Sequence, residues 1–468
     1  MFAEVGGNVA DQFDVVVIGA GPGGYPTAIR AAQLGLSVAC VEKELLGGVC
    51  LNWGCIPSKA LLKTAELALK IGHAEDFGLS VSDLQIDFGK VVGRSRDVAN
   101  KFERGVGGLF KKYGVTRVEG TARIASPSEV VVESADGTRT LSAQHIVVAT
   151  GARARVFPGM EPDGERIHTY RDAIVLTDKP ASAVILGSGA IGIEFAYFWN
   201  AMGVKVTVVE GLDEIVPRED REIGKTLRRS LQKIGIDFKL GQFVDTVVRD
   251  GDGVKVTLKD GTELSAERCL LALGITPNTD GIGLEDVGIT VDRGFIPIDD
   301  FGRTRVAGIY AVGDCTTRGG LAHTATAQGH VLAELLAGHH PVPVDYDAIP
   351  SCTYCQPQIA SVGLTEEQAK AAGKAYKVGR FPFQANGKMY GAGTPEGFVK
   401  VLIGEQYGEI IGAHIIGADA TEMIAEYTLA RSSELTADEI LHTVHAHPTA
   451  AEVMYEAVAN AQGVSVHI

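Results

Sequence analysis

Two cysteines near the start of the chain, Cys50 and Cys55, have a spacing that suggests redox chemistry. They lie at the head of an amphipathic helical pattern, within GGVCLNWGCIPSKALLKTAELALK at residues 47–70. In a regular α-helix, Cα atoms five residues apart are roughly 8 to 9 Å apart, whereas a disulfide requires less than about 7 Å. If the two cysteines form a disulfide, the pair must precede the helix or distort it.

The helix is expected to begin close to Cys55, because Gly54 permits a bend and Pro57 is tolerated only in a first turn. A helix N-terminus stabilises a thiolate, the species that exchanges disulfides and donates electrons. The alternative is a pair of buried structural cysteines, the commoner fate of free cysteine. Cys352 and Cys355 form a CxxC without a second ligand pair of matching spacing, so we expect no metal site and assign them no chemistry.

A second set of residues that could do chemistry lies in HTVHAHPTAAEVMYEAVANA, at residues 442–461. Pro448 suits the first turn of a helix, which would place His447 at the start of that helix. Glu452 could then reach the imidazole and fix one tautomer, making an acid/base dyad. The alternative from spacing alone is a capping box of Thr449 and Glu452, with His447 merely preceding it.

The elements that must position these residues include an internal repeat. Residues 14–42 and 183–210 each read as an apolar strand, a Gly-rich turn, a small-residue helix and a strand that ends in an acid. The acids, Glu42 and Glu210, each follow the first glycine of their turn by 23 positions. Such glycines let the backbone approach a pyrophosphate, and the acid accepts hydrogen bonds from ribose hydroxyls. The candidate glycines are Gly19, Gly21 and Gly24 in the first copy and Gly187, Gly189 and Gly192 in the second.

We therefore expect two dinucleotide sites, although Gly-rich turns that only pack a helix on a strand are the alternative. Glu210 favours NAD in the second site, because a carboxylate there would repel the 2′-phosphate of NADP. Further strands of the two units are expected at HIVVATG (145–151), RCLLALGITPN (268–278) and IYAVGDC (309–315). Asp314 could bond a polyol chain or could serve only as a turn residue.

The remainder of the chain, from about Ile349, changes character. SCTYCQPQIASVGLT and FVKVLI alternate apolar and polar residues, and helical patterns follow near residues 419–435 and after residue 448. This predicts an α+β domain.

The composition sets limits on the class of protein. The 468 residues suggest three or four domains, and 45% hydrophobic residues with 58 glycines fit an α/β protein. A net charge of -15 opposes nucleic acids and anionic membranes as partners. No apolar run approaches the ~20 residues of a membrane span, and the acidic start Met1–Asp14 lacks Lys and Arg, so we expect a cytoplasmic protein. Seven scattered cysteines favour a catalytic disulfide over a structural scaffold.

Together these motifs resemble those of the class I pyridine nucleotide-disulfide oxidoreductases, a family of flavoproteins. The motifs are GGVCLNWGCIPSK, the two Gly-rich fingerprints, AVGD, LAH at residues 321–323 and HAHPTAAE. HAHPT is closer to the members that oxidise dihydrolipoamide than to the glutathione reductases. The resemblance implies an α/β fold with two Rossmann-like domains and two further domains. These are an FAD-binding domain with the redox-active disulfide (1–155), an NAD-binding domain (156–280), a central domain completing the FAD site (281–348) and an α+β dimer-interface domain (349–468).

The resemblance also implies a role for each matching residue. Cys50 would be the interchange thiol that attacks the substrate, and Cys55 the charge-transfer thiol beside the flavin. His447 and Glu452 of one chain would serve the cysteines of the other chain in a homodimer.

Other residues are implied as cofactor contacts by the same resemblance. Lys59 would contact the flavin and pair with Glu194; without the family, two solvated surface charges would be the expected interpretation. Val244 and Gly274 would border NAD. The further FAD contacts would be Gly120, Gly151, Asp314, Gly320, Leu321, Ala322 and His323.

The activity implied by the resemblance is oxidation of protein-bound dihydrolipoamide to lipoamide, with one tightly bound FAD per subunit and NAD as electron acceptor. The partners would be the lipoyl domains of 2-oxoacid dehydrogenase complexes or related lipoyl carriers. The alternatives are another FAD-dependent disulfide reductase of the family, or a non-catalytic docking or redox-sensing subunit. Glu210 and HAHPT argue against glutathione reductase, a C-terminus without cysteine against mercuric reductase, and intact Cys50 and Cys55 against a transhydrogenase or a non-catalytic subunit.

Overall fold

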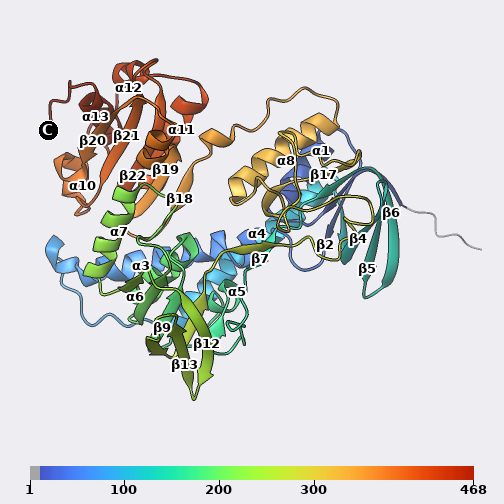
Figure 1. Ribbon diagram of the computed structural model, residues 1–468, viewed down its shortest axis with the longest axis horizontal. Helices are drawn as coiled ribbons and strands as arrows, with labels where there is room; N and C mark the ends of the chain where they lie inside the picture. The colour runs from blue at the N-terminus through green and yellow to red at the C-terminus, as the bar shows by residue number, and fades with distance from the viewer. Residues whose placement is uncertain (1–10) are drawn as a thin grey trace, which may run out of the picture. The chain divides into compact units, whose positions relative to one another are not determined.

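The computed structural model describes residues 11–468 (Figure 1). Residues 1–10, which hold most of the acidic start, lie outside the described residues. The described chain is a mixed α/β protein that divides into two compact units. The first unit contains the residues up to Ala60, Gly93–Arg155 and Ile275–Val344, and the second contains Leu61–Val92, Val156–Gly274 and Asp345–Ile468.

The first unit is built on a seven-stranded sheet. In its middle, β1 (Asp11–Ile18) runs parallel to β2 (Val38–Glu42) on one side and to β6 (Gly137–Val148) on the other. Residues Val15–Ile18 of β1 are buried, because both faces of a parallel sheet are covered. The sheet is completed by β3 (Thr116–Glu119), β4 (Thr121–Ser126), β5 (Glu129–Ser134) and β17 (Ile309–Ala311).

Two helices of this unit, α1 (Gly24–Gln33) and α8 (Ala322–Leu336), pack against each other (Figure 1). The first glycine-rich turn lets α1 begin directly after β1. A Cβ on Gly24 would lie 1.8 Å from the carbonyl oxygen of Gly19, so only glycine allows this close approach.

The second unit repeats this arrangement with a parallel sheet in the order β11-β10-β9-β15-β8. Its strands are β8 (Ile167–His168), β9 (Ser182–Leu186), β10 (Lys205–Glu210), β11 (Asp237–Leu240) and β15 (Arg268–Leu271). The second glycine-rich turn joins β9 to α6 (Ala190–Ala201), and α7 (Arg221–Lys233) follows β10. The predicted duplication of a strand, turn, helix and strand is confirmed.

One expected strand is divided in the structure. The segment 268–278 contains β15, which joins the parallel sheet, and a separate strand, β16 (Ile275–Pro277). β16 instead pairs antiparallel with β7 (Ala152–Ala154) of the first unit. Gly274, with a φ of +98°, directly precedes β16 and lets the chain turn away from the parallel sheet after β15.

The second unit also contains a three-stranded antiparallel sheet of β12 (Val244–Asp250), β13 (Gly253–Leu258) and β14 (Glu263–Ala266). The C-terminal part of this unit is an antiparallel sheet in the order β18-β19-β22-β21-β20 with helices packed on it. This confirms the α+β character predicted from Ile349 onward. Tyr427 of α11 (Ala420–Ser432) is fully buried and donates a hydrogen bond to the carbonyl of Met454 in α13 (Glu452–Ala461) at 2.7 Å. The strands are β18 (Ser351–Thr353), β19 (Gln358–Gly363), β20 (Tyr376–Pro382), β21 (Phe398–Gly404) and β22 (Ile410–Gly417).

A buried ion cluster joins this antiparallel sheet to α7, which follows β10 of the parallel sheet within the second unit. Lys400 of β21 is only 3% exposed, and its Nζ lies 3.0 Å from both carboxylate oxygens of Asp220. Asp220 also caps the N-terminus of α7 through the N–H of Glu222. Lys400 Nζ lies 2.7 Å from Glu366 Oε2, and the hydrogen bonds from Lys370 and Lys400 lower the pKa of Glu366 to about 2.

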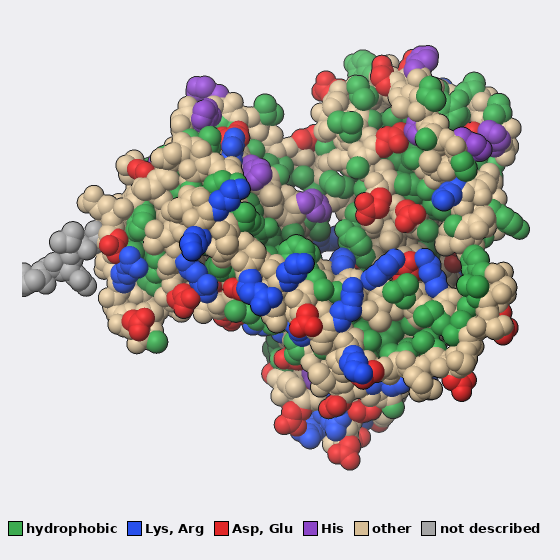
Figure 2. All heavy atoms as spheres, turned by 180° about the vertical axis from the view of Figure 1, so that it is seen from behind, with side chains coloured by type: hydrophobic (Ala, Val, Ile, Leu, Met, Phe, Trp, Pro, Cys, Tyr) green, Lys and Arg blue, Asp and Glu red, His purple; other side chains and the backbone are tan. Residues whose placement is uncertain are grey.

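The surface of the described chain mixes charges of both signs. Figure 2 shows Asp and Glu side chains (red) and Lys and Arg side chains (blue) on the same face. Among residues 11–468, no helix is both long enough and apolar enough to cross a membrane. Within the same residues, no three His, Cys, Asp or Glu side chains gather as metal ligands would.

Candidate active site

The two cysteines form a disulfide, and their Cα atoms are 4.7 Å apart. Cys50 lies in a short helix, α2 (Gly48–Asn52), and Cys55 is the first residue of α3 (Cys55–Gly72). Because the chain leaves the helical path between α2 and α3, the two cysteines come closer than one regular helix would allow. The prediction that the regular helix begins close to Cys55 is confirmed.

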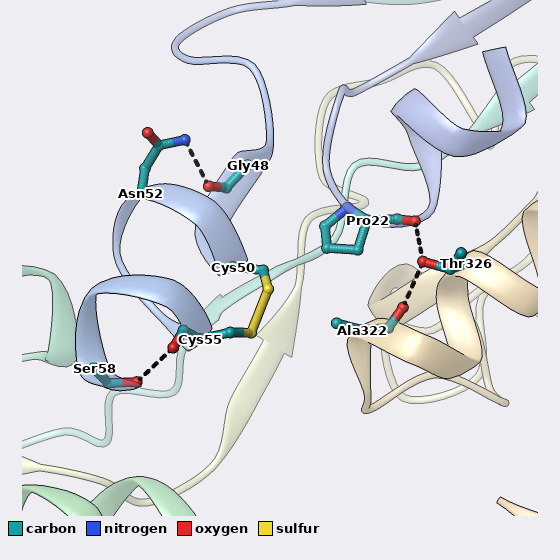
Figure 3. The surroundings of a disulfide bond; sticks show 8 residues. All are labelled: Pro22, Gly48, Cys50, Asn52, Cys55, Ser58, Ala322 and Thr326. Atoms are coloured by element: carbon teal, nitrogen blue, oxygen red, sulfur yellow. Dashed lines mark hydrogen bonds between the residues drawn. A yellow bond between two sulfur atoms is a disulfide. The ribbon is translucent and has the colours of Figure 1, made fainter. Parts of the chain in front are cut away.

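Hydrogen bonds hold both helix ends at the disulfide (Figure 3). The side-chain amide of Asn52 donates to the carbonyls of Leu46 and Gly48, each at 3.0 Å, and closes α2. The hydroxyl of Ser58 donates to the carbonyl of Cys55 at 3.2 Å in the first turn of α3. The positive end of the α3 dipole therefore lies at Cys55, where it favours a thiolate once the disulfide is reduced.

The disulfide segment lies directly against the first glycine-rich turn. The N–H of Gly47 donates to the carbonyl of Ala20 at 2.8 Å. Gly48 has a φ of +57°, and a Cβ on it would lie 2.8 Å from the Cα of Gly21. The first candidate nucleotide site and the disulfide segment are therefore in direct backbone contact. Sequence spacing alone did not predict this contact.

Several predicted FAD contacts come together at the ends of the strands in the first unit. Glu42 accepts the N–H of Ala20 at 2.8 Å, and its own carbonyl accepts the N–H of Gly120 at 3.0 Å. Asp314 accepts the N–H of Gly320 at 2.8 Å, and burial raises the pKa of its carboxyl group above its usual value.

The remaining predicted contacts of this group lie on neighbouring segments of the same unit. Leu321 immediately precedes α8, and Ala322 and His323 are its first two residues. Gly151 has a φ of +67°, and a Cβ on it would lie in open space, with no atom of residues 11–468 within 4 Å apart from its two chain neighbours.

The second glycine-rich turn lines a cavity of about 450 Å³ in the second unit. Glu210 Oε2 accepts hydrogen bonds from the N–H and the hydroxyl of Ser188, and Oε1 accepts the N–H of Leu212. Val244 lines the same cavity, as predicted for a residue bordering NAD. The other lining residues are Phe157, Met160, Gly187, Gly189, Val209, Gly211, Gln242, Phe243, Lys259, Ala272 and Leu273.

Three other predicted residues of the second unit do not line this cavity. Gly192 has a packing role, since a Cβ on it would lie 2.0 Å from the carbonyl oxygen of Gly187. Gly274 lies just beyond the lining residue Leu273. Glu194 of α6 is buried and accepts the N–H of Tyr354 at 3.1 Å.

The predicted acid/base dyad forms, with a change in its local structure. His447 Nδ1 lies 2.8 Å from Glu452 Oε1, and the imidazole is exposed. The helix begins at Glu452, not at Pro448, and Ala450 and Ala451 form a turn directly before it. The position proposed for Pro448 in a first helical turn is therefore wrong.

Glu452 also takes part of the alternative role considered for it. Its Oε2 accepts the N–H of Thr449 at 2.8 Å, but the Thr449 hydroxyl donates to the carbonyl of Ala446, so only half of a capping box forms. Burial by itself raises the pKa of Glu452, but the hydrogen bonds from Thr449 and His447 outweigh it, and the pKa is lowered overall. The carboxylate therefore stays charged while it orients the imidazole.

A second hollow of about 450 Å³ lies between α1 and α8 in the first unit. Thr326 lines it and is one of the residues surrounding the disulfide in Figure 3, where its hydroxyl bonds to the carbonyls of Pro22 and Ala322. Arg30 and Glu334 form an ion pair of 2.7 Å across the hollow.

Comparison with known proteins places this geometry in a family. The sequence model described as "Pyridine nucleotide-disulphide oxidoreductase" matches residues 13–329, and that of the family's dimerisation domain matches residues 349–458. The chain belongs to the pyridine nucleotide-disulphide oxidoreductase family. The predicted family and fold class are confirmed.

Relatives within this family are similar over nearly their whole length. "Dihydrolipoyl dehydrogenase" of Rhizobium etli is 44% identical over 97% of this chain and 99% of its own, and that of Zymomonas mobilis is 43% identical over 98% and 100%. Among solved structures, LpdA from Mycobacterium tuberculosis has a TM-score of 0.91 at 29% identity, covering 96% of this chain and 99% of its own. An HOCl-induced flavoprotein disulfide reductase from Escherichia coli has a TM-score of 0.87 at 25% identity, covering 96% and 99%.

Members of the pyridine nucleotide-disulphide oxidoreductase family use a flavin and a pyridine nucleotide, and the residues present fit both groups. Gly151 leaves open space, and the carboxyl of Asp314 is half-buried shortly after β17, where a polyol hydroxyl could bond it. In the second unit, the walls of the cavity around Glu210 combine apolar side chains with a few oriented polar groups.

Some residues of this family member's site were not found by sequence reasoning. Pro22 and Thr326 lie near the disulfide, and Phe157, Phe243 and Lys259 line the cavity around Glu210. Pro22 lies inside the first glycine-rich turn, where no role was assigned to it. The other four lie outside the motifs, at positions that only the tertiary structure brings together. The aromatic residue beside Val244, Phe243, was the one with a sequence signal, because it immediately precedes a predicted contact.

Proposed function

We propose that this chain oxidises protein-bound dihydrolipoyl groups to the cyclic disulfide and reduces NAD, as a dihydrolipoyl dehydrogenase. The observation that carries the proposal is the Cys50–Cys55 disulfide at the N-terminus of α3, held against the first glycine-rich turn. The relatives of that name support the choice of substrate, since they match this chain over nearly its full length.

The proposed cofactors are one tightly bound FAD per subunit and NAD. Lys59 and Gly19, Gly21, Gly24, Glu42, Gly120, Gly151, Asp314 and Gly320–His323 would hold the flavin nucleotide. The cavity around Glu210, with Gly187, Gly189 and Val244, would hold NAD. When bound, the flavin would accept two electrons from the reduced cysteine pair and pass a hydride to the nicotinamide.

In the proposed reaction, a substrate thiolate attacks the sulfur of Cys50, and the disulfide bond breaks to release Cys55 as a thiolate. The dipole of α3 stabilises this thiolate. His447, oriented by Glu452, takes the proton from the second substrate thiol. That sulfur attacks the mixed disulfide, so the substrate leaves as a cyclic disulfide and Cys50 leaves as a thiol or thiolate. Two electrons then remain in the cysteine pair.

The proposed assembly is a homodimer in which His447 and Glu452 of one subunit serve Cys50 and Cys55 of the other. The match to the family's dimerisation domain over residues 349–458 supports a dimer. The proposed partners are lipoyl domains. The pairing of Lys59 with Glu194, the four domain boundaries and a cytoplasmic location also stay predictions.

A steady-state comparison of substrates tests this function. The purified protein with its flavin would be offered dihydrolipoamide with NAD or NADP, and glutathione disulfide with NADH or NADPH. We expect rapid NAD reduction by dihydrolipoamide and little turnover with the other pairs. Turnover confined to glutathione disulfide and NADPH would reject the proposal.

A further inference from the structure

We propose that Phe243 is the aromatic platform on which the adenine of NAD stacks, which makes it a further specificity-determining residue. This inference rests on the proposed use of NAD. It starts from two large apolar side chains on the wall of the nucleotide cavity that water can reach, Phe243 at 59% exposure and Leu212 at 50%. Apolar groups exposed in a concave site indicate a ligand that covers them.

The position of these two side chains matches the adenine end of the dinucleotide. Glu210 ends β10, where the acid of this fold bonds the adenosine ribose. The base is attached to that ribose, so it must lie beyond Glu210 on the segments that flank it. Leu212 comes from the segment after β10, and Phe243 comes from the segment after β11.

Backbone hydrogen bonds fix these two segments side by side. The N–H of Gln242 donates to the carbonyl of Glu210 at 3.0 Å, and the N–H of Gly241 donates to that of Leu212 at 2.8 Å. The carbonyl of Phe243 accepts the N–H of Lys259 at 2.8 Å. The backbone that carries the ring is therefore held from two sides before any ligand binds, which reduces the entropy lost on binding.

Gly211 makes room for the ring itself. A Cβ on Gly211 would lie 2.6 Å from Cε1 of Phe243 and 3.0 Å from Cδ1. One side of the aromatic ring thus packs closely against the backbone next to Glu210, and more than half of the residue stays exposed for a base to cover. Phe157 also lines the cavity and is 41% exposed, but it belongs to a segment before β8 rather than to those flanking Glu210.

The test measures binding directly, with calorimetry on the flavin-loaded protein. The probes are NAD, AMP, which carries the adenine half, and nicotinamide mononucleotide, which carries the other half. Oxidised NAD and its mononucleotide have no hydride to transfer to the flavin, so the measured heat reports binding alone. For Phe243→Ala we expect NAD and AMP to bind roughly 5-fold to 100-fold more weakly, the usual loss of one base-aromatic stack. The affinity for nicotinamide mononucleotide should not change.

Two further variants make the result specific. Phe243→Tyr should retain the affinity for AMP, because a tyrosine ring stacks equally well. Phe102→Ala, at an exposed ring of α4 (Phe88–Tyr113) that does not line the cavity, should also retain it. An unchanged affinity of Phe243→Ala for AMP, or an equal loss of the mononucleotide, would overturn the inference. A wild-type protein that binds NADP but not NAD would instead overturn the proposed function.

Discussion

Glu452 serves two neighbours with one carboxylate. One oxygen orients His447 and the other holds the backbone of Thr449, so the base is tied to the turn that precedes α13. The sequence left a dyad and a capping box as alternatives. Both were partly right, because a carboxylate has acceptor sites enough for two donors.

At this scale we predict that His447→Gln loses dithiol oxidation while the rest of the protein stays intact. Loss of a general base costs typically about 10²-fold to 10⁴-fold in rate. Reduction of the flavin by NADH, followed by its absorbance, should be unchanged because it does not require this base. His442→Gln, at another exposed histidine of the same segment, is the control and should keep full activity. Equal dithiol turnover in His447→Gln would contradict the assignment.

At the scale of the elements, the break between α2 and α3 allows Cys50 and Cys55 to come close enough to form a disulfide. It was predictable, because five residues of regular helix hold two Cα atoms too far apart and because Gly54 and Pro57 mark the helix start. The contact of Gly48 with Gly21 was not predictable, since the residues are distant in sequence and neither spacing nor hydrophobic pattern records a close backbone approach.

We predict that Gly48→Ala lowers both thermal stability and flavin retention. The positive φ costs a non-glycine residue roughly 1 to 2 kcal/mol, and its Cβ would push the glycine-rich turn away from α2. The measurements are a melting curve and the ratio of flavin to protein absorbance. Gly93→Ala, in the open interior of α4 (Phe88–Tyr113), is the control and should be neutral or stabilising by about 1 kcal/mol. Full flavin retention in Gly48→Ala would show that this contact is dispensable.

The buried ion cluster around Lys400 also acts between two elements, because it joins β21 to the start of α7. Burial by itself raises the pKa of Asp220, but neighbouring His414, Lys400 and hydrogen bonds lower it overall. Burial lowers the pKa of His414, whereas the Lys400 ammonium lies 3.0 Å from both oxygens of Asp220 and is the cation that pairs with it directly.

We predict that Lys400→Met destabilises the protein by about 3 to 5 kcal/mol at pH 7, because it leaves a buried carboxylate without its cation. In the wild type, the carboxylates have lowered pKa values, so their stabilisation is present above the unfolded pKa near 4.5 and is lost as pH falls toward about 2. The difference in the free energy of unfolding between wild type and variant, measured with denaturant, should therefore become smaller below about pH 4. Lys370→Met removes the same charge at the surface and should cost little. A stability difference that stays constant down to pH 3 would argue against the link between these carboxylate pKa values and stability.

For the whole molecule, the two glycine-rich motifs and the cysteine segment were enough to predict an α/β protein with a duplicated nucleotide fold. Motif spacing fixes local strand, turn and helix order, and these units depend on few distant contacts. The division of 268–278 between two sheets and the burial of Lys400 could not be predicted, because both depend on which segments meet in three dimensions.

At this scale we predict that two inactive variants restore each other. Cys50→Ser lacks the interchange thiol and His447→Gln lacks the base, so each homodimer should fail to oxidise dihydrolipoamide. If the site is shared between subunits, refolding an equal mixture gives hybrid dimers with one complete site. Random pairing would then restore about a quarter of the wild-type rate. If the refolded mixture is as inactive as each variant alone, Cys50 and His447 of the same chain would belong to one site.

The ion cluster at Lys400 also limits how parts of this protein can be exchanged with its relatives. Residues 156–274 and the C-terminal residues 345–468 belong to one compact unit, in which Asp220 of the first range pairs with Lys400 of the second. A chimera that takes its last 120 or so residues from a relative without a matching lysine would inherit an orphaned buried acid. We expect such chimeras to fold stably only where the acid that caps α7 and the lysine of β21 are both present.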